Sequence, residues 1–367
     1  MSIKDFLKEP DAVLLCEDGT EFWGYRFGST KKGFGEVIFN TAMCGYQEVL
    51  TDTSYHQQIV AMTYPHQGNY GLNSDDDESV GGPKVSGFIV VEDTLKPSNF
   101  TSKLSLQTYL EKYDIPALFG IDTRKLTLHL RSKGAMRGLI LSKKERQEIG
   151  KDIEKTFSRY PSFLGRDLIR EVTTKKPYWY SKEGTKIVVA LDFGIKTNLL
   201  RELKNRGCRI AVLPATATTI EIEEYKPDGI FLSNGPGDPA TAIYAIQTVQ
   251  NLLGKKPIFG VCMGHQIMAL ALGGKTYKMK FGHRGVNQPV FNLDKKTVEI
   301  SSHNHGFAVD ADSLPKSVRM THINLNDKTC EGLECVEKKA FSVQYHPESA
   351  PGPHDSEYLF DRFVGMM

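Results

Sequence analysis

The chain has 367 residues, of which 40% are hydrophobic and 25% charged, an ordinary composition for a globular protein with room for two domains. Its 46 Lys and Arg residues nearly balance 44 Asp and Glu residues, giving a net charge of +2. No long basic stretch stands out, so nucleic acid is not expected as a partner. No stretch approaches about 20 apolar residues, and the charged N-terminus lacks the apolar core of a signal peptide, so no membrane partner is expected.

The six cysteines include no CxxC pair, and their spacings resemble neither a disulfide framework nor a zinc site. Reduced thiols are the simplest explanation, so we expect a cytoplasmic protein.

The first half of the chain mixes strand and helix patterns without a regular alternation. We therefore expect a mixed α+β N-terminal domain over residues 1–184. Its last part, from about residue 171, is polar, contains Pro177 and is interpreted as a linker. The expected elements are strands at 12–16, 37–39 and 85–91 and helices at 103–112 and 122–132.

From residue 185 onward, continuous apolar strands alternate with helices. This pattern is typical of a parallel sheet that is covered on both faces. Residues 185–367 are therefore expected to form an α/β domain with a doubly wound, mostly parallel sheet. The expected strands are 186–192, 208–213, 229–233, 257–261 and 341–345, and the expected helices are 195–206, 240–252 and 264–272.

Cys262 lies in the run Gly260-Val261-Cys262-Met263-Gly264, between an expected buried strand and an expected helix. This is the cysteine form of the nucleophile elbow, in which a sharp turn lifts the nucleophile to the carboxyl edge of a sheet. The flanking glycines leave room for the turn. The N–H groups and the dipole of the following helix favour a thiolate. We therefore expect Cys262 to be a catalytic nucleophile.

A base for this thiol is expected at His346, which follows the strand 341–345. Glu348 is two residues further on, so an extended chain places both side chains on one face. Glu348 can then fix the imidazole tautomer while the other ring nitrogen faces the thiol.

The oxyanion hole is expected to consist of backbone N–H groups. Met263 supplies one at the helix start. The second is expected from the loop Gly235-Pro236-Gly237, which follows the neighbouring strand and lacks the pattern of a phosphate-binding loop.

The motifs GVCMGHQ, SNGPGDP and YHPE, in this order, resemble the class I, triad-type glutamine amidotransferase family over residues 186–363. Two further runs, 278–290 and 303–310, are similar to the small, glutaminase subunit of carbamoyl-phosphate synthase. In the N-terminal half, 35–71 and 120–138 are similar to the N-terminal domain of that subunit. The resemblance therefore covers nearly the whole chain.

The resemblance assigns site residues position by position. Cys262, His346 and Glu348 match the catalytic triad. The positions that match glutamine-binding residues are Ser54, Gly235, Gly237, Met263, Gln266, Asn304, Gly306 and Phe307.

Four positions depart from the family's pattern. Met263 stands where leucine is usual, Thr53 replaces a common proline, His303 stands where glutamine is frequent, and Leu128 stands where arginine is common. None of them belongs to the triad, and Met263 contributes through its backbone.

The pair His303 and His305, like His283, raises the question of a metal site. We expect none, because no third ligand at metal spacing accompanies them in the sequence.

The resemblance implies that the chain hydrolyses glutamine to glutamate and ammonia and passes the ammonia to a large partner subunit in a heterodimer. No nucleotide-binding loop is present, so no cofactor is expected in this chain. ATP and Mg²⁺ are expected on the large subunit, which makes carbamoyl phosphate from bicarbonate, ammonia and ATP for arginine and pyrimidine biosynthesis. The N-terminal domain is the expected docking surface.

Three alternatives are distinguishable from the sequence. An amidotransferase subunit of another synthase, such as that of anthranilate or GMP synthesis, is expected to be shorter or to carry a synthase domain. A catalytically silent regulatory subunit does not need an intact triad. A free-standing hydrolase does not need a long N-terminal region without a catalytic constellation of its own.

Overall fold

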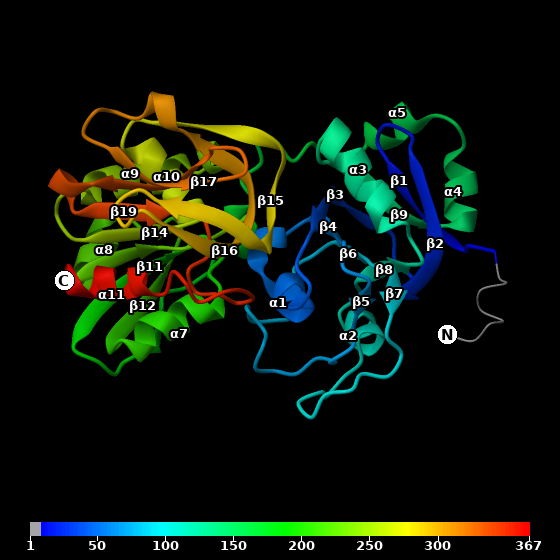
Figure 1. Ribbon diagram of the computed structural model, residues 1–367, viewed down its shortest axis with the longest axis horizontal. Helices are drawn as coiled ribbons and strands as arrows, with labels where there is room; N and C mark the ends of the chain where they lie inside the picture. The colour runs from blue at the N-terminus through cyan, green and yellow to red at the C-terminus, as the bar shows by residue number, and fades with distance from the viewer. Residues whose placement is uncertain (1–8) are drawn as a thin grey trace. The chain divides into compact units, whose positions relative to one another are not determined.

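The computed structural model describes residues 9–367, and the chain divides into two compact units, Met1–Phe163 and Leu164–Met367 (Figure 1). Residues 1–8, which begin the run examined for a signal peptide, lie outside the described part. Among the described residues, no helix has both the length and the apolar character needed to cross a membrane.

Seven strands of the first unit close into a barrel in the order β1-β2-β8-β6-β4-β3-β9. Closure depends on β1 (Ala12–Cys16), which pairs antiparallel with both β2 and β9 and is buried at all five residues. The other barrel strands are β2 (Glu21–Gly28), β3 (Gly33–Asn40), β4 (Gln58–Met62), β6 (Gly87–Ile89), β8 (Pro116–Phe119) and β9 (Met136–Ser142).

The predicted mixture of strands and helices in this region is confirmed, and the barrel closure is the feature that the sequence did not predict. A separate short pair of strands consists of β5 (His66–Gln67) and β7 (Glu92–Asp93). The helices of the first unit are α1 (Tyr46–Thr51), η1 (Thr53–Tyr55), α2 (Leu106–Lys112), α3 (Thr123–Lys133), α4 (Lys143–Ile149) and α5 (Ile153–Phe157).

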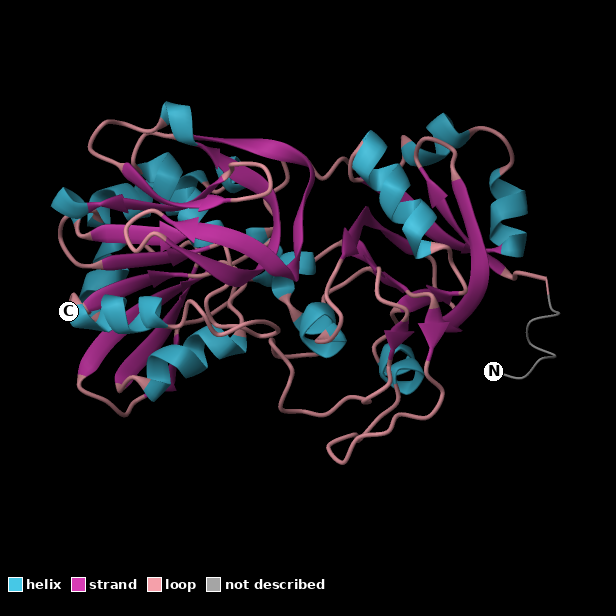
Figure 2. Ribbon diagram, viewed as in Figure 1, coloured by secondary structure: helices cyan, strands magenta, loops and turns pink. Residues whose placement is uncertain are grey.

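The second unit contains a large sheet with helices packed beside it (Figure 2). The sheet has ten strands in the order β10-β12-β11-β13-β14-β19-β18-β16-β15-β17. The run from β12 to β19 is parallel, as predicted. An antiparallel extension of four strands follows it. The strands are β10 (Tyr178–Ser181), β11 (Lys186–Asp192), β12 (Cys208–Pro214), β13 (Gly229–Leu232), β14 (Ile258–Val261), β15 (Lys275–Asn292), β16 (Thr297–Asp310), β17 (Arg319–Asn324), β18 (Cys330–Cys335) and β19 (Ala340–Val343).

Helices cover both faces of the parallel strands because alternate strand residues point to opposite sides. On β11, Val189 and Leu191 face a core shared with α8, α9 and α10, whereas Val188 and Ala190 face a core shared with α7 and α11. The helices are α6 (Ile169–Val172), α7 (Thr197–Asn205), α8 (Thr219–Glu224), α9 (Ile243–Leu252), α10 (Met263–Ala271) and α11 (Tyr358–Gly365), with the short helices η2 (Pro239–Thr241), η3 (Ala311–Ser313) and η4 (Val336–Lys338).

The segment interpreted as a linker is part of the second unit, whose boundary lies before residue 164 rather than at residue 185. Strand β10 forms the edge of the large sheet and pairs antiparallel with β12. Ile169 on α6 is buried in the core of this unit, and Trp179 packs against that core. The aromatic residues of β10 favour a strand, but the charged residues around them make the segment resemble a polar linker. Pro177 is compatible with this strand, because a proline is tolerated just before an edge strand.

Candidate active site

Cys262 lies in the strand-to-helix turn that the sequence predicts, between β14 and α10. Its φ is 54° and its ψ is −102°, a backbone conformation that is uncommon for a residue other than glycine and costs about 1–3 kcal/mol. Two backbone hydrogen bonds hold the turn: Cys262 N–H donates to the Val343 carbonyl at 2.9 Å, and Gln266 N–H donates to the Cys262 carbonyl at 3.1 Å. The side chain is 2% exposed. The structure therefore holds the thiol in a strained, well-supported position.

Close backbone approach explains the glycines around this turn. A Cβ atom on Gly264 would lie 2.2 Å from the Leu232 carbonyl oxygen, and the Gly264 N–H donates to Ser233 at 2.9 Å. A Cβ atom on Gly235 would likewise lie 2.2 Å from the Phe193 carbonyl oxygen. Both contacts are far below van der Waals distance, so only glycine fits at either position.

His346 and Glu348 form the predicted pair just beyond β19. The His346 Nδ1 and the Glu348 Oε1 are 2.8 Å apart, and both residues are buried. The His346 N–H donates to the Ser302 carbonyl at 2.8 Å, which attaches the pair to β16. The other ring nitrogen, Nε2, is buried and has no hydrogen-bond partner among the described residues. One imidazole nitrogen is thus fixed by a carboxylate, and the other is available for proton transfer.

The charges of this pair stabilise each other. Burial alone would lower the pKa of His346, but the charge of Glu348, its hydrogen bond to the imidazole and the nearby sulfur of Cys262 outweigh it and raise this pKa to about 10. Burial alone would raise the pKa of Glu348, but Lys196 and His346 hold it at about 2. Near neutral pH the imidazolium and the carboxylate therefore form an ion pair, with the thiol of Cys262 close to the imidazolium.

Lys196 is the functional residue that sequence reasoning missed. Its Nζ lies 2.6 Å from the Glu348 Oε1, also bonds to the Ala350 carbonyl, and its side chain is only 3% exposed. Its backbone N–H donates to the Asn234 Oδ1 at 3.0 Å, at the start of the glycine loop. The available signal was its position just after β11, because the carboxyl ends of parallel strands meet at one edge of the sheet.

Three predicted glutamine-binding residues are connected to the nucleophile's surroundings. The Gln266 Nε2 donates to the Phe307 carbonyl at 2.9 Å and to the Gln344 Oε1 at 3.0 Å. The Cys262 Sγ donates to the Asn304 carbonyl at 3.6 Å. Strand β16 therefore lies beside the thiol. The side-chain amide N–H groups of Gln266 are hydrogen-bonded within the protein.

The remaining predicted residues are placed as follows. Met263 is the first residue of α10, so its N–H is one of the donors that a helix leaves unpaired in its first turn. Gly237 has a φ of +92° and approaches Leu168, and Gly306 lies on β16. Ser54 lies in the first unit on η1, where its N–H donates to the Asp52 Oδ1 at 2.8 Å. Its role in glutamine binding stays a prediction.

The structure also brings three histidines together. His283, His303 and His305 gather with Glu331, and all four are buried. The sequence shows no further ligand at metal spacing, but Glu331, which is distant in the sequence, supplies a fourth possible ligand from β18.

Comparison with known proteins shows which family models the chain matches. Residues 189–366 match the model for class-I glutamine amidotransferases, and residues 14–140 match the model for the CPSase domain of the carbamoyl-phosphate synthase small chain.

Curated relatives match over nearly the full length. The carbamoyl phosphate synthase small chain of Syntrophotalea carbinolica is 52% identical, with 97% of each chain covered. That of Nostoc sp. is 49% identical over 97% of this chain and 95% of the relative, and that of Salmonella typhimurium is 48% identical over 97% of each. The chain belongs to the family of carbamoyl phosphate synthase small chains, with a class-I glutamine amidotransferase domain in its second half.

Proposed function

We propose that this chain hydrolyses L-glutamine to glutamate and ammonia and supplies the ammonia for carbamoyl phosphate synthesis. The observation that carries the proposal is the arrangement of Cys262, His346 and Glu348: a thiol on a strained turn, next to an imidazole that a buried carboxylate orients. This is the arrangement that acyl transfer through a thioester requires.

The reaction proceeds in two steps. Cys262 attacks the carboxamide carbon of glutamine as a thiolate, its proton having passed to His346, and the imidazolium of His346 then gives that proton to the departing nitrogen, which leaves as ammonia. A glutamyl thioester remains. The neutral His346 then takes a proton from water, the resulting hydroxide attacks the thioester, and glutamate leaves with the thiol restored. The N–H groups of Met263 and of the Gly235 loop stabilise the oxyanion in both steps.

Ammonia must reach a second active site without being protonated in water, since ammonium is not a nucleophile. We propose that a large subunit binds this chain through its first unit and receives the ammonia by an enclosed route. That subunit binds ATP and Mg²⁺ and makes carbamoyl phosphate from bicarbonate and ammonia, for arginine and pyrimidine biosynthesis. We also propose that the heterodimer works in the cytoplasm, as the reduced cysteines indicate.

Replacing the nucleophile tests this function. Cys262→Ser is expected to abolish glutamine-dependent carbamoyl phosphate formation by the complex with the large subunit, while added ammonium salt still supports it, because only the ammonia source is lost. Carbamoyl phosphate is measured with each nitrogen donor in turn. The control is Cys44→Ser, which removes an exposed thiol and should leave both activities unchanged.

Two outcomes would contradict the proposal. Glutamine use that survives Cys262→Ser would remove the nucleophile from the mechanism. Glutaminase activity of the purified chain that does not rise when the large subunit is added would instead favour a free-standing hydrolase.

A further inference from the structure

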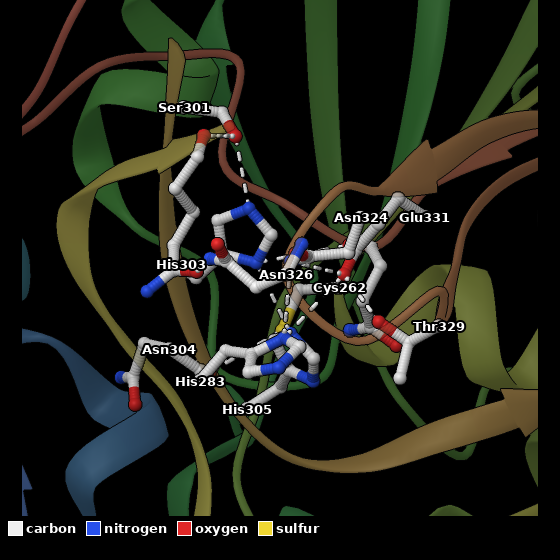
Figure 3. A network of polar contacts seen from close by, with 12 residues as sticks. Cys262, His283, Ser301, His303, Asn304, His305, Asn324, Asn326, Thr329 and Glu331 are labelled. Carbon is white, nitrogen blue, oxygen red and sulfur yellow. Dashed lines mark hydrogen bonds and ion pairs between the residues drawn. The ribbon is translucent and has the colours of Figure 1, made fainter. Parts of the chain in front are cut away.

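A second cluster of reactive side chains lies in the antiparallel part of the large sheet. It consists of His283 on β15, His303 and His305 on β16, and Glu331 on β18, and we call it the histidine cluster. Each residue offers one ligand atom, and these four atoms all lie within 4.8 Å of one another. Figure 3 shows the three rings and the carboxylate converging on one small region.

The spacing of the facing atoms matches a four-coordinate metal site. His303 Nδ1 and His305 Nε2 are 3.2 Å apart. The carboxylate oxygens of Glu331 lie 3.5 Å from His283 Nδ1 and 3.7 Å from His303 Nδ1. A tetrahedral zinc ion with bonds of about 2.0–2.1 Å separates its ligand atoms by about 3.3–3.4 Å. Only small side-chain movements would therefore bring the four atoms to bonding distance.

Each imidazole is also oriented by a partner on its far side. His283 Nε2 lies 2.8 Å from the Asp327 Oδ2, His305 Nδ1 lies 2.8 Å from the Phe307 carbonyl, and His303 Nε2 lies 2.9 Å from the Ser301 Oγ. Metal-bound histidines characteristically donate their other N–H to a carboxylate, a carbonyl or another oxygen, which fixes the tautomer. The cluster has this arrangement at all three rings.

One oxygen of the cluster is left without a hydrogen bond. The Glu331 Oε1 accepts from Asn324 and Thr329, but the Glu331 Oε2 is buried and has no hydrogen-bond partner among the described residues. An unpaired carboxylate oxygen in a site with no solvent exposure costs free energy, and a cation at the centre would remove that cost.

We propose that His283, His303, His305 and Glu331 bind one Zn²⁺ ion in a closed, structural site. Four protein ligands leave no open position for water, so the ion stabilises the fold and takes no part in glutamine hydrolysis. Its effect reaches the active site through β16, because Asn304 lies between two of the ligands and its carbonyl accepts from the Cys262 Sγ. The ion would hold this strand in register beside the thiol.

Zinc binding to the purified full-length chain tests the proposal directly. The chain is stripped with a chelator and titrated with Zn²⁺, and bound metal is measured by elemental analysis together with the thermal midpoint. We expect one Zn²⁺ per chain and a higher midpoint with zinc, since an ion that binds only the folded state stabilises it. Co²⁺ in its place should give the visible absorption of a tetrahedral site.

Matched variants separate this site from other zinc-binding groups. His303→Gln removes a ligand and should weaken binding more than about 100-fold, because loss of a mere orienting partner costs 10–100-fold. Asp327→Asn, on a side chain that is 40% exposed, removes such a partner and should fall within that smaller range. His354→Gln, at an exposed histidine, and Cys262→Ser should both bind zinc like the unchanged chain.

The proposal is overturned if the unchanged chain binds no stoichiometric zinc, since the cluster is then only a hydrogen-bonded network. It is overturned equally if His303→Gln and Asp327→Asn bind zinc as tightly as the unchanged chain, or if Cys262→Ser abolishes binding, because the ion then sits on the catalytic thiol.

Discussion

Lys196 shows how one side chain outside the motifs sets the electrostatics of the triad. Its ammonium group and the imidazolium of His346 share the same oxygen of Glu348, at 2.6 and 2.8 Å. A carboxylate this deeply buried would otherwise take up a proton, because burial disfavours its charged form. Lys196 contributes most to keeping the pKa of Glu348 low, with His346 second.

Removing this charge should therefore damage both catalysis and stability. In Lys196→Met, Glu348 is expected to bind a proton at higher pH and to orient His346 less well, so the acid limb of the glutaminase profile moves to higher pH and kcat falls at least about tenfold. Breaking a buried ion pair on one side costs about 3–5 kcal/mol of unfolding free energy. The measurements are kcat/KM for glutamine against pH and urea unfolding.

Lys204→Met is the matched control, because Lys204 lies on α7, the helix that begins directly after Lys196, and is exposed. It should leave the profile and the stability unchanged. If the acid limb of Lys196→Met stays where it was while kcat falls, the lysine acts only through packing.

For single residues, the sequence predicts a catalytic role where a short motif surrounds the residue. Cys262 is recognisable from its flanking glycines, and His346 with Glu348 from a two-residue spacing on an extended chain. Lys196 and Glu331 belong to no such motif. Lys196 meets Glu348, and Glu331 meets His283, only when segments far apart in the sequence become neighbours in the fold. Sequence spacing alone cannot show these contacts.

At the scale of the elements, the position of the nucleophile depends on a cluster of aromatic rings that joins β14, β19 and α11. Phe259 on β14 stacks on Phe341 of β19 with ring centroids 4.5 Å apart, and it also contacts Phe360 and Phe363 of α11. All four rings are fully buried. Strand β14, which ends one residue before Cys262, is thus anchored on the face of the sheet opposite to α10.

Phe259→Ala should cost about 3–5 kcal/mol of unfolding free energy, because it leaves a cavity that rigid neighbours cannot fill. Ile243→Ala, at a side chain that is 60% exposed on α9, should change stability by less than about 0.5 kcal/mol. Chemical denaturation of both variants gives the comparison. Similar losses in the two would mean that this aromatic cluster does not anchor β14.

Element prediction succeeded where burial leaves a continuous apolar run. The strands at 186–192, 208–213, 229–233 and 257–261 appear in the structure within a residue or two, as do the helices at 195–206 and 264–272. The helix expected at 240–252 begins three residues later, and the short helix α8 was not predicted. The antiparallel extension was not predicted, because β15 and β16 are long strands with many polar residues and two register shifts between them. The two strands pair with each other across residues 293–296, but the register shifts interrupt the period-two pattern that would reveal a strand in the sequence.

At the scale of the whole molecule, the domain boundary is the feature that the sequence misplaced. Residues 164–184 are polar, and polarity is a good sign of a linker only when the segment has nothing to pair with. Here the segment completes the second unit: Thr174 N–H donates to the Asp192 Oδ2 at 2.7 Å, and Thr173 Oγ1 donates to the Asp192 carbonyl at 2.6 Å. Burial raises the pKa of the Asp192 carboxyl, so its hydrogen bonds matter for its charged form.

Two truncated chains distinguish the boundaries. A chain of residues 164–367 keeps β10, α6 and the hydrogen bonds to Asp192. A chain of residues 185–367 lacks them: the edge of β12 is exposed, the loss of Ile169 leaves a cavity in the core, and Asp192 loses hydrogen-bond donors. For a domain of this size, 1 kcal/mol corresponds to about 2–4 °C in the unfolding midpoint. Losing one buried aliphatic side chain and its neighbours costs several kcal/mol, so the shorter chain should melt more than about 5 °C lower. Circular dichroism melts measure the difference, and equal midpoints would show that residues 164–184 are a passive connection after all.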